Sequence, residues 1–247
     1  MNGARMQSVP IFDRSTAVLL GNFNPAIFSP AWLSENELVS PEDAQRSTIQ
    51  IIHPEICQFE VGQFNIMCDT QRFVVSCVTS QSEMIRDLIT MLFGNMLKYT
   101  PMTALGMNRD VHFDVGDYWV RNMVGDELAP KSAWGEWSQF LTNEKKEPPQ
   151  FSGLASISIR EVHVEPLRGL VQATVQPSNL PNLVQTGIYL GINNHMELAN
   201  QYGTSASYKL MSLIEAHWQN ANDKSDFILA QVQTLVERCR KIKDNLK

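Results

Sequence analysis

The chain has 247 residues, of which 43% are hydrophobic and 19% are charged, and its formal net charge is −6. This composition is typical of a folded protein with a sizeable core and argues against disorder. Negative charge gives no attraction to phosphate backbones or anionic lipids, so nucleic acids and membrane surfaces are unfavoured partners. The sequence also lacks a bilayer-length apolar stretch and an N-terminal signal-peptide pattern, so we expect a cytoplasmic protein.

Short strand patterns dominate the first half of the chain. An apolar run at 17–24 predicts a strand that ends at Asn24-Pro25. Four β-branched or aromatic segments follow in quick succession, at 48–53, 56–61, 64–69 and 72–78. Because the connections between them are short, they predict an antiparallel meander.

A helix and a further strand are expected after the meander. Apolar residues recur at helical spacing over residues 80–97, at Ile85, Leu88, Ile89, Leu92 and Met96. This apolar face predicts a helix that docks on the meander. A strand at 102–107 is then expected to turn at residues 108–110 and to resume through Phe113, before a helix at 117–128 that ends ahead of Pro130.

The second half of the chain repeats this outline. Residues 143–150 combine a charged run with Pro148-Pro149, and they predict a hinge or exposed loop between an N-terminal half, 1–142, and a C-terminal half, 151–247. Strands are expected at 155–164, 169–175 and 186–192, followed by a hairpin of two helices at 205–220 and 225–243. We therefore predict an α+β fold of two pseudo-repeated halves, each an antiparallel sheet packed with helices.

One short segment occurs in both halves. Residues 105–108 and 190–193 both read Leu-Gly-apolar-Asn, and a histidine follows each of them, at His112 and His195. The first copy also carries Asp110, which shares the alternation of Asn108 and His112, so an extended strand would point all three to one side.

These polar residues are the candidates for chemistry. Asp110 next to His112 could form a catalytic acid–base pair. His112 could alternatively bind a divalent metal together with His195. The structural alternative makes His112 a half-buried strand residue and leaves Asp110 bonded to nearby amides. The common nucleophile, zinc and phosphate-loop motifs are absent from the sequence, which favours a non-enzymatic protein without a cofactor.

The four cysteines, Cys57, Cys68, Cys77 and Cys239, lack metal-ligand spacing, so we expect buried, reduced thiols. If residues 70–71 form a tight turn, Cys68 faces Phe73 and Cys77 faces Phe64, which prevents a disulfide between the two cysteines.

The last predicted helix carries an apolar seam with 4-3-4-3-4 spacing. Its members are Ile228, Val232, Leu235, Cys239, Ile242 and Leu246. The seam could pack within the helical hairpin, or its end could serve a partner helix. The second interpretation predicts a homo-oligomer or a complex with another protein.

Several of these segments together resemble a sporadically distributed family of bacterial proteins of similar length that have no assigned activity. The resemblance covers residues 64–78, 84–97, 105–108 and 193–196, although the family's form of the third segment contains an arginine that this chain lacks. It implies an architecture and a bacterial stress or phage-defence setting, without a mechanism. The sequence thus favours an accessory protein that acts by assembly, and the alternative is a metal-dependent hydrolase or acid–base enzyme.

Overall fold

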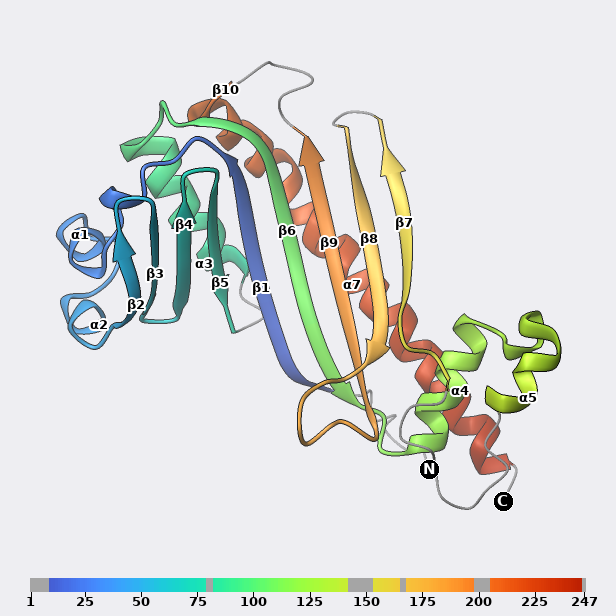
Figure 1. Ribbon diagram of the computed structural model, residues 1–247. Coiled ribbons are helices and arrows are strands. Elements are labelled where there is room, and N and C mark those ends of the chain that lie inside the picture. Colours follow the sequence, from blue (N-terminus) through green and yellow to red (C-terminus); the bar gives the residue numbers. More distant parts are fainter. Residues whose placement is uncertain (1–8, 79–81, 142–152, 165–167, 198–204, 246–247) are drawn as a thin grey trace, which may run out of the picture.

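The computed structural model describes residues 9–78, 82–141, 153–164, 168–197 and 205–245 (Figure 1). Its strands form a single antiparallel sheet with the order β2-β3-β4-β5-β1-β6-β9-β8-β7, and the short β10 pairs with β6. The strands are β1 (Pro10–Gly21), β2 (Thr48–His53), β3 (Ile56–Val61), β4 (Phe64–Asp69), β5 (Arg72–Cys77), β6 (Pro101–Asp114), β7 (Ile157–His163), β8 (Gly169–Pro177), β9 (Gly187–Glu197) and β10 (Ser205–Ala206).

The helices are mostly short, with one exception at the end of the chain. They are η1 (Pro25–Ile27), α1 (Pro30–Glu35), α2 (Pro41–Gln45), α3 (Ser82–Ile89), η2 (Thr90–Met96), α4 (Tyr118–Leu128), η3 (Lys131–Trp137), α5 (Ser138–Leu141) and α7 (Ser207–Asn245). Figure 1 shows α7 running diagonally behind the sheet, with α3 on the same side. We call this side the helix face and the opposite side the open face. In the described residues, no helix is both long and apolar enough to span a membrane.

The predicted meander is confirmed, including its register. β2 to β5 form consecutive antiparallel pairs, and in the β4–β5 pair Cys68 lies opposite Phe73 while Phe64 lies opposite Cys77. All four cysteines are buried and free, as expected.

The predicted turn at residues 108–110 is wrong, because β6 continues through it. Asn108 pairs with Thr16 of β1 on one side and with Asn193 of β9 on the other, and the pairing extends to Phe113 on both sides. A ladder of backbone hydrogen bonds on two sides outweighs the local turn preference of Asn and Asp, which is a weak prior that tertiary context overrides.

The predicted hairpin of two C-terminal helices is also wrong, because α7 is a single helix of 39 residues. The expected break at residues 222–224 contains no Gly or Pro, and its polar groups find partners: Asn222 donates to Ser82 Oγ at 2.7 Å, and Asp223 accepts from Gln219 at 2.8 Å. Ala221 and Ser225 on either side are buried, so the helix keeps contact with the protein through this region.

The strands of the two predicted halves belong to one sheet, so the prediction of a separate sheet in each half is wrong. β6 of the first half pairs with β9 of the second half from Ala104 to Asp114. The predicted hinge at 143–150 lies outside the described residues. The mixed α+β class and the antiparallel pairing are confirmed, whereas the internal repeat stays a prediction.

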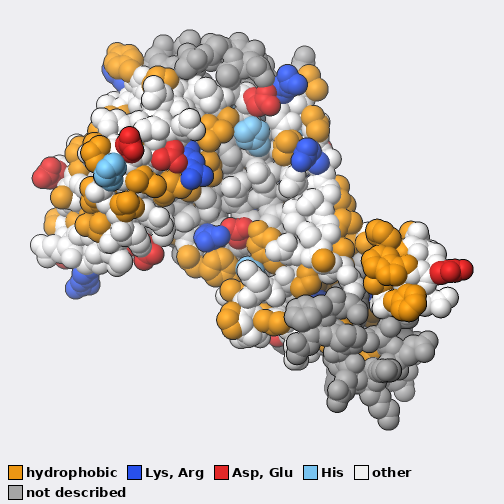
Figure 2. Space-filling view, in the orientation of Figure 1, with side chains coloured by type: hydrophobic (Ala, Val, Ile, Leu, Met, Phe, Trp, Pro, Cys, Tyr) orange, Lys and Arg blue, Asp and Glu red, His pale blue; other side chains and the backbone are white. Residues whose placement is uncertain are grey.

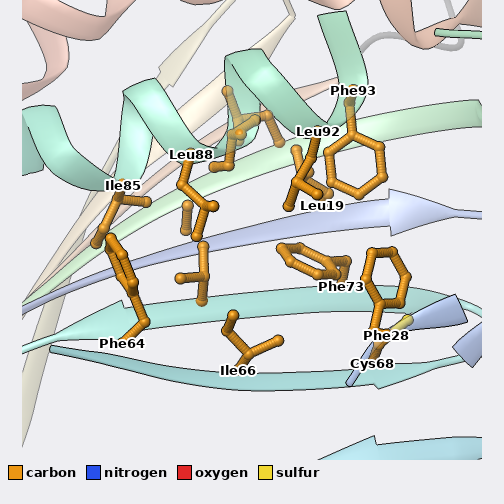
Figure 3. Packing of buried hydrophobic residues seen from close by; sticks show 14 of the residues in the cluster. Leu19, Phe28, Phe64, Ile66, Cys68, Phe73, Ile85, Leu88, Leu92 and Phe93 are labelled. Atoms are coloured by element: carbon orange, nitrogen blue, oxygen red, sulfur yellow. The ribbon is translucent and has the colours of Figure 1, made fainter. Parts of the chain in front are cut away.

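The core consists of two hydrophobic clusters on the helix face. The first joins β1 and β3–β5 to α3 and η2, and Figure 3 shows Leu88, Leu92 and Phe93 from the helices meeting Leu19 and Phe73 from the strands. The second joins β6, β8 and β9 to α4 and to the C-terminal half of α7. The predicted docking of the first helix on the meander is therefore confirmed, with its last two turns in π conformation over Thr90–Met96.

We predict that Leu92→Ala destabilises the protein by about 2–5 kcal/mol, because it removes a fully buried side chain and leaves a cavity among aromatic rings. The neighbouring Met91 is 44% exposed, so Met91→Ala should change the free energy of unfolding by less than about 0.5 kcal/mol. Urea unfolding of the two variants measures the difference. Equal losses would show that η2 is peripheral to the core.

Candidate functional site

The polar residues singled out in β6 lie in a cluster on the open face, where β1, β6 and β9 run side by side (Figure 1). We call Arg14, Asp110, His112, Ser178 and Tyr189 the polar cluster. Arg14 lies directly opposite Asp110 in the β1–β6 register, and His112 lies opposite Tyr189 in the β6–β9 register. Alternation along β6 places Asp110 and His112 on the same face, as the sequence predicted.

Both carboxylate oxygens of Asp110 have hydrogen-bond donors. Arg14 donates to Oδ2 from Nε at 3.2 Å and from Nη2 at 2.8 Å, and the Tyr189 hydroxyl donates to Oδ1 at 2.6 Å. Burial raises the pKa of Tyr189 and the hydrogen bond to Asp110 raises it further, so the hydroxyl keeps its proton. Asp110 is therefore held by charged and neutral donors from both neighbouring strands.

Gly191 makes the contact between Tyr189 and Asp110 possible. Gly191 lies opposite Asp110, and the Tyr189 side chain leans along its own strand over this glycine. A Cβ atom at residue 191 would lie 2.4 Å from the Tyr189 hydroxyl oxygen, which is far inside van der Waals contact. Gly106, its counterpart in the repeated segment, has only an ordinary 3.7 Å approach to Val18. The two glycines of the repeated motif thus have different structural roles.

His112 is almost fully buried and points its Nδ1 atom at Ser178 rather than at Asp110. The Nδ1–Oγ distance is 2.8 Å, and Ser178 Oγ also accepts from the Leu180 backbone N–H at 3.2 Å. The imidazole ring packs 4.9 Å from the Tyr189 ring and 5.6 Å from the Phe12 ring, centroid to centroid. Burial lowers the pKa of His112, and this effect exceeds the opposing effect of Asp110. The ring is therefore neutral at neutral pH, and an Asp–His dyad is not formed.

His195 is on the open face but far along β9. Six residues separate it from Tyr189, the strand partner of His112, which corresponds to roughly 20 Å at the rise of a β-strand. The predicted metal pair of His112 and His195 is therefore not brought together. His195 also borders a pocket of about 220 Å³ on the side of the sheet that α7 covers, and His163 and His217 are among the residues that line this pocket. Among the described residues, no group of three His, Cys, Asp or Glu side chains has metal-binding geometry.

The predicted apolar seam of α7 packs largely inside the protein. Val232 and Cys239 are buried in the second hydrophobic cluster, and Ile228 and Leu235 pack against it. Ile242 is 38% exposed, and Leu246 lies outside the described residues. The seam faces the sheet and α4 rather than a second helix of a hairpin.

No local sequence pattern indicates the residues that complete the polar cluster. Arg14 is separated from Asp110 by 96 residues and Tyr189 from Asp110 by 79, so only the strand register joins them. The same holds for Arg109 on the helix face, which donates to Asp13 of β1 at 2.8 Å and also pairs with Asp226 of α7. These hydrogen bonds and ion pairs raise the pKa of Arg109, which stays charged.

Comparison with known proteins adds no identity to this geometry. No protein-family model matches the chain, and no curated protein matches it.

We predict that Gly191→Ala destabilises the protein by about 1–3 kcal/mol, because the added methyl group displaces the Tyr189 side chain. In a Tyr189→Ala background the same substitution should cost much less, since nothing then occupies that space. Gly106→Ala is the matched control and should be neutral or slightly stabilising, because Gly in a strand costs about 0.5–1 kcal/mol relative to Ala. Chemical denaturation of the four variants measures this coupling, and additive effects at residues 189 and 191 would contradict it.

A second prediction concerns acid stability. The unfolded-state pKa of histidine is about 6.5, and that of His112 is lower in the folded protein. Below about pH 6.5 the unfolded state therefore binds more protons, and stability present above that pH is lost as the pH falls toward the folded-state value. His112→Gln should show a flatter fall in unfolding free energy between pH 7.5 and 5.5 than the parent. An unchanged slope in His112→Gln would refute the assignment.

Proposed function

We propose that this protein is a cytoplasmic, non-enzymatic accessory protein that acts by assembling with a second copy of itself. The main support for this proposal is that β2 forms an exposed edge of the sheet. In the described part of the chain β2 pairs only with β3, and all six of its residues are exposed.

The β2 edge is unusually apolar for an unpaired strand. Ile49, Ile51 and Ile52 are 53%, 41% and 48% exposed. Natural sheets usually protect such edges with lysine, proline or inward-pointing charges. This strand, TIQIIH, contains none of these, and its pairing with β3 has a register shift between Ile49 and Ile51. An edge of this kind favours pairing with another strand.

A second copy is the partner that fits this edge best. Two β2 strands related by a two-fold axis would run antiparallel, which is the arrangement of every neighbouring pair in the sheet. Backbone hydrogen bonds would then continue the sheet across the axis, and the exposed isoleucines of both copies would lose contact with water. Two-fold dimers are also the commonest assemblies of soluble proteins.

A second exposed surface supports assembly with another chain as an additional role. Trp134, Trp137 and Phe140 are exposed on η3 and α5, and the two indole rings pack edge to face with centroids 5.4 Å apart. Figure 2 shows hydrophobic side chains gathered on this projection at the right of the molecule. Tryptophan is enriched at the energetic centres of protein interfaces.

The competing proposal is an acid–base enzyme or metal-dependent hydrolase that uses Asp110 and His112 with His195. The geometry favours it less, because the carboxylate of Asp110 and the Nδ1 atom of His112 are engaged by neighbouring side chains. These contacts are those of a structural network that joins three strands.

We predict that the wild-type protein is a dimer in light scattering at micromolar concentration and that Ile49→Lys with Ile51→Lys makes it monomeric. The two charges oppose burial of the edge, and each 1.4 kcal/mol lost from association weakens it tenfold. Because both residues are exposed, the double variant should keep a melting transition close to that of the parent.

The matched control is Trp134→Ser with Trp137→Ser, which alters the aromatic projection and should leave the dimer intact. A monomeric wild type would exclude self-assembly and favour a different partner chain. A lysine variant that remains dimeric would show that another surface holds the two copies together.

A further inference from the structure

A pocket lies where α4 meets the ends of β8 and β9 and the connection between them. Its volume is about 470 Å³, within the range of small-molecule sites. Val124 of α4, Val175 of β8 and Ile188 of β9 form an apolar floor, and all three are buried. Leu154 closes one side, where it packs so close to Gly125 that a Cβ there would lie 3.0 Å from the leucine Cβ.

Among the described residues that line this pocket, Arg121 of α4 is the one cation. Its Nη1 donates to the backbone carbonyl of Val184 at 2.6 Å, and its guanidinium lies 4.8 Å from the centre of the Tyr118 ring. Arg121 also makes a side-chain hydrogen bond with Tyr118. These contacts fix the direction of the side chain while using only part of its donor capacity, because a guanidinium carries five N–H groups.

Arg121 has no carboxylate partner within the described ranges. The acids on and next to α4 are engaged by other cations: Asp117 by Lys243, Asp126 by Lys131 and Glu127 by Arg238. No Asp or Glu is among the described residues that line the pocket. The protein has a net charge of −6, yet within the described residues the Arg121 guanidinium lies beside an apolar cavity without an acidic counter-ion. Such a group binds carboxylates well, through two parallel hydrogen bonds.

Different side chains form the polar and the apolar parts of the pocket lining. Asn122, Gln176 and Asn179 join Arg121 as its polar lining, whereas the floor is formed by branched aliphatic side chains. A ligand that matches both parts is amphiphilic, with one negative charge at one end. A dianion or a phosphate ester is matched less well, because the described lining supplies a single cation.

We infer that this pocket binds an aliphatic monocarboxylate. The carboxylate accepts hydrogen bonds from the Arg121 guanidinium, and the alkyl chain lies against Val124, Val175 and Ile188. The site is separate from the β2 edge, so ligand binding and self-assembly can fail independently.

Calorimetric titration with decanoate, below its micelle concentration, tests the site. We expect saturable binding to the wild-type protein and at least tenfold weaker binding to Arg121→Gln. Arg121→Lys keeps the positive charge but loses the two parallel hydrogen bonds, so its affinity should lie between those of the wild type and Arg121→Gln. Ala155→Phe introduces a large side chain at an exposed residue that lines the pocket, and it should also abolish binding. Arg86→Gln, on α3, is the control and should bind like the wild type.

Titration with decanol, which has the same alkyl chain without the carboxylate, measures the contribution of the chain alone. Decanol should bind the wild type more weakly than decanoate does, and Arg121→Gln should not change its affinity. Equal decanoate binding by the wild type and Arg121→Gln would overturn the role of the arginine. Undiminished binding by Ala155→Phe would overturn the location, and it would do so even if Arg121→Gln failed to fold.

Discussion

Two ion pairs that cross between β1 and β6 fix the register on which the rest of the sheet depends. Arg14 lies directly opposite Asp110 in the β1–β6 register, whereas Asp13 and Arg109 lie diagonally across the two strands, opposite Val111 and Ser15. Each strand therefore supplies one acid and one base. Arg14 pairs with Asp110 on the open face, and Arg109 pairs with Asp13 on the helix face, both at 2.8 Å. A slip of one residue would turn every side chain of one strand to the opposite face. The pair on the helix face, which is the less exposed, would then leave charges buried without partners, at a cost of several kcal/mol.

The same four residues connect this register to the other layers. Arg109 also pairs with Asp226 of α7, and Asp110 also accepts from Tyr189 of β9. β6 is therefore bonded through its side chains to the strand on each side and to the helix across its face. This explains why the chain forms one continuous sheet under one long helix. A sheet for each half would need an edge between β6 and β9, where the hydrogen-bonding and side-chain contacts are instead continuous.

Whether a feature of the structure is predictable from the sequence depends on how far apart along the chain the interacting residues lie. The meander and the facing of Cys68 and Phe73 depend on residues close in sequence, and the apolar face of the docked helix is itself a local pattern, so these features are predictable. The alternation of Asp110 and His112 was equally local. Their partners Arg14, Ser178 and Tyr189 were not predictable, since no local pattern specifies a pairing across 66 to 96 residues. The helical hairpin was mispredicted because Asn222 and Asp223 favour turns only where nothing buries the helix on either side of them.

The polar cluster differs from the β2 edge and the Arg121 pocket, where we propose binding, in how far its recognition groups have partners within the fold. In the polar cluster, the carboxylate oxygens of Asp110 and the Nδ1 of His112 have partners within the fold, and mutual satisfaction of this kind stabilises a structure without providing a reactive group. The β2 edge and the Arg121 pocket differ, because each presents a recognition group whose complement the described chain does not supply. Free strand edges and a cation without a counter-ion gain most from an external partner, since desolvation there is offset by new hydrogen bonds. Function in this fold is therefore expected at the far edge of the sheet and at the end of α4, away from its most polar strand.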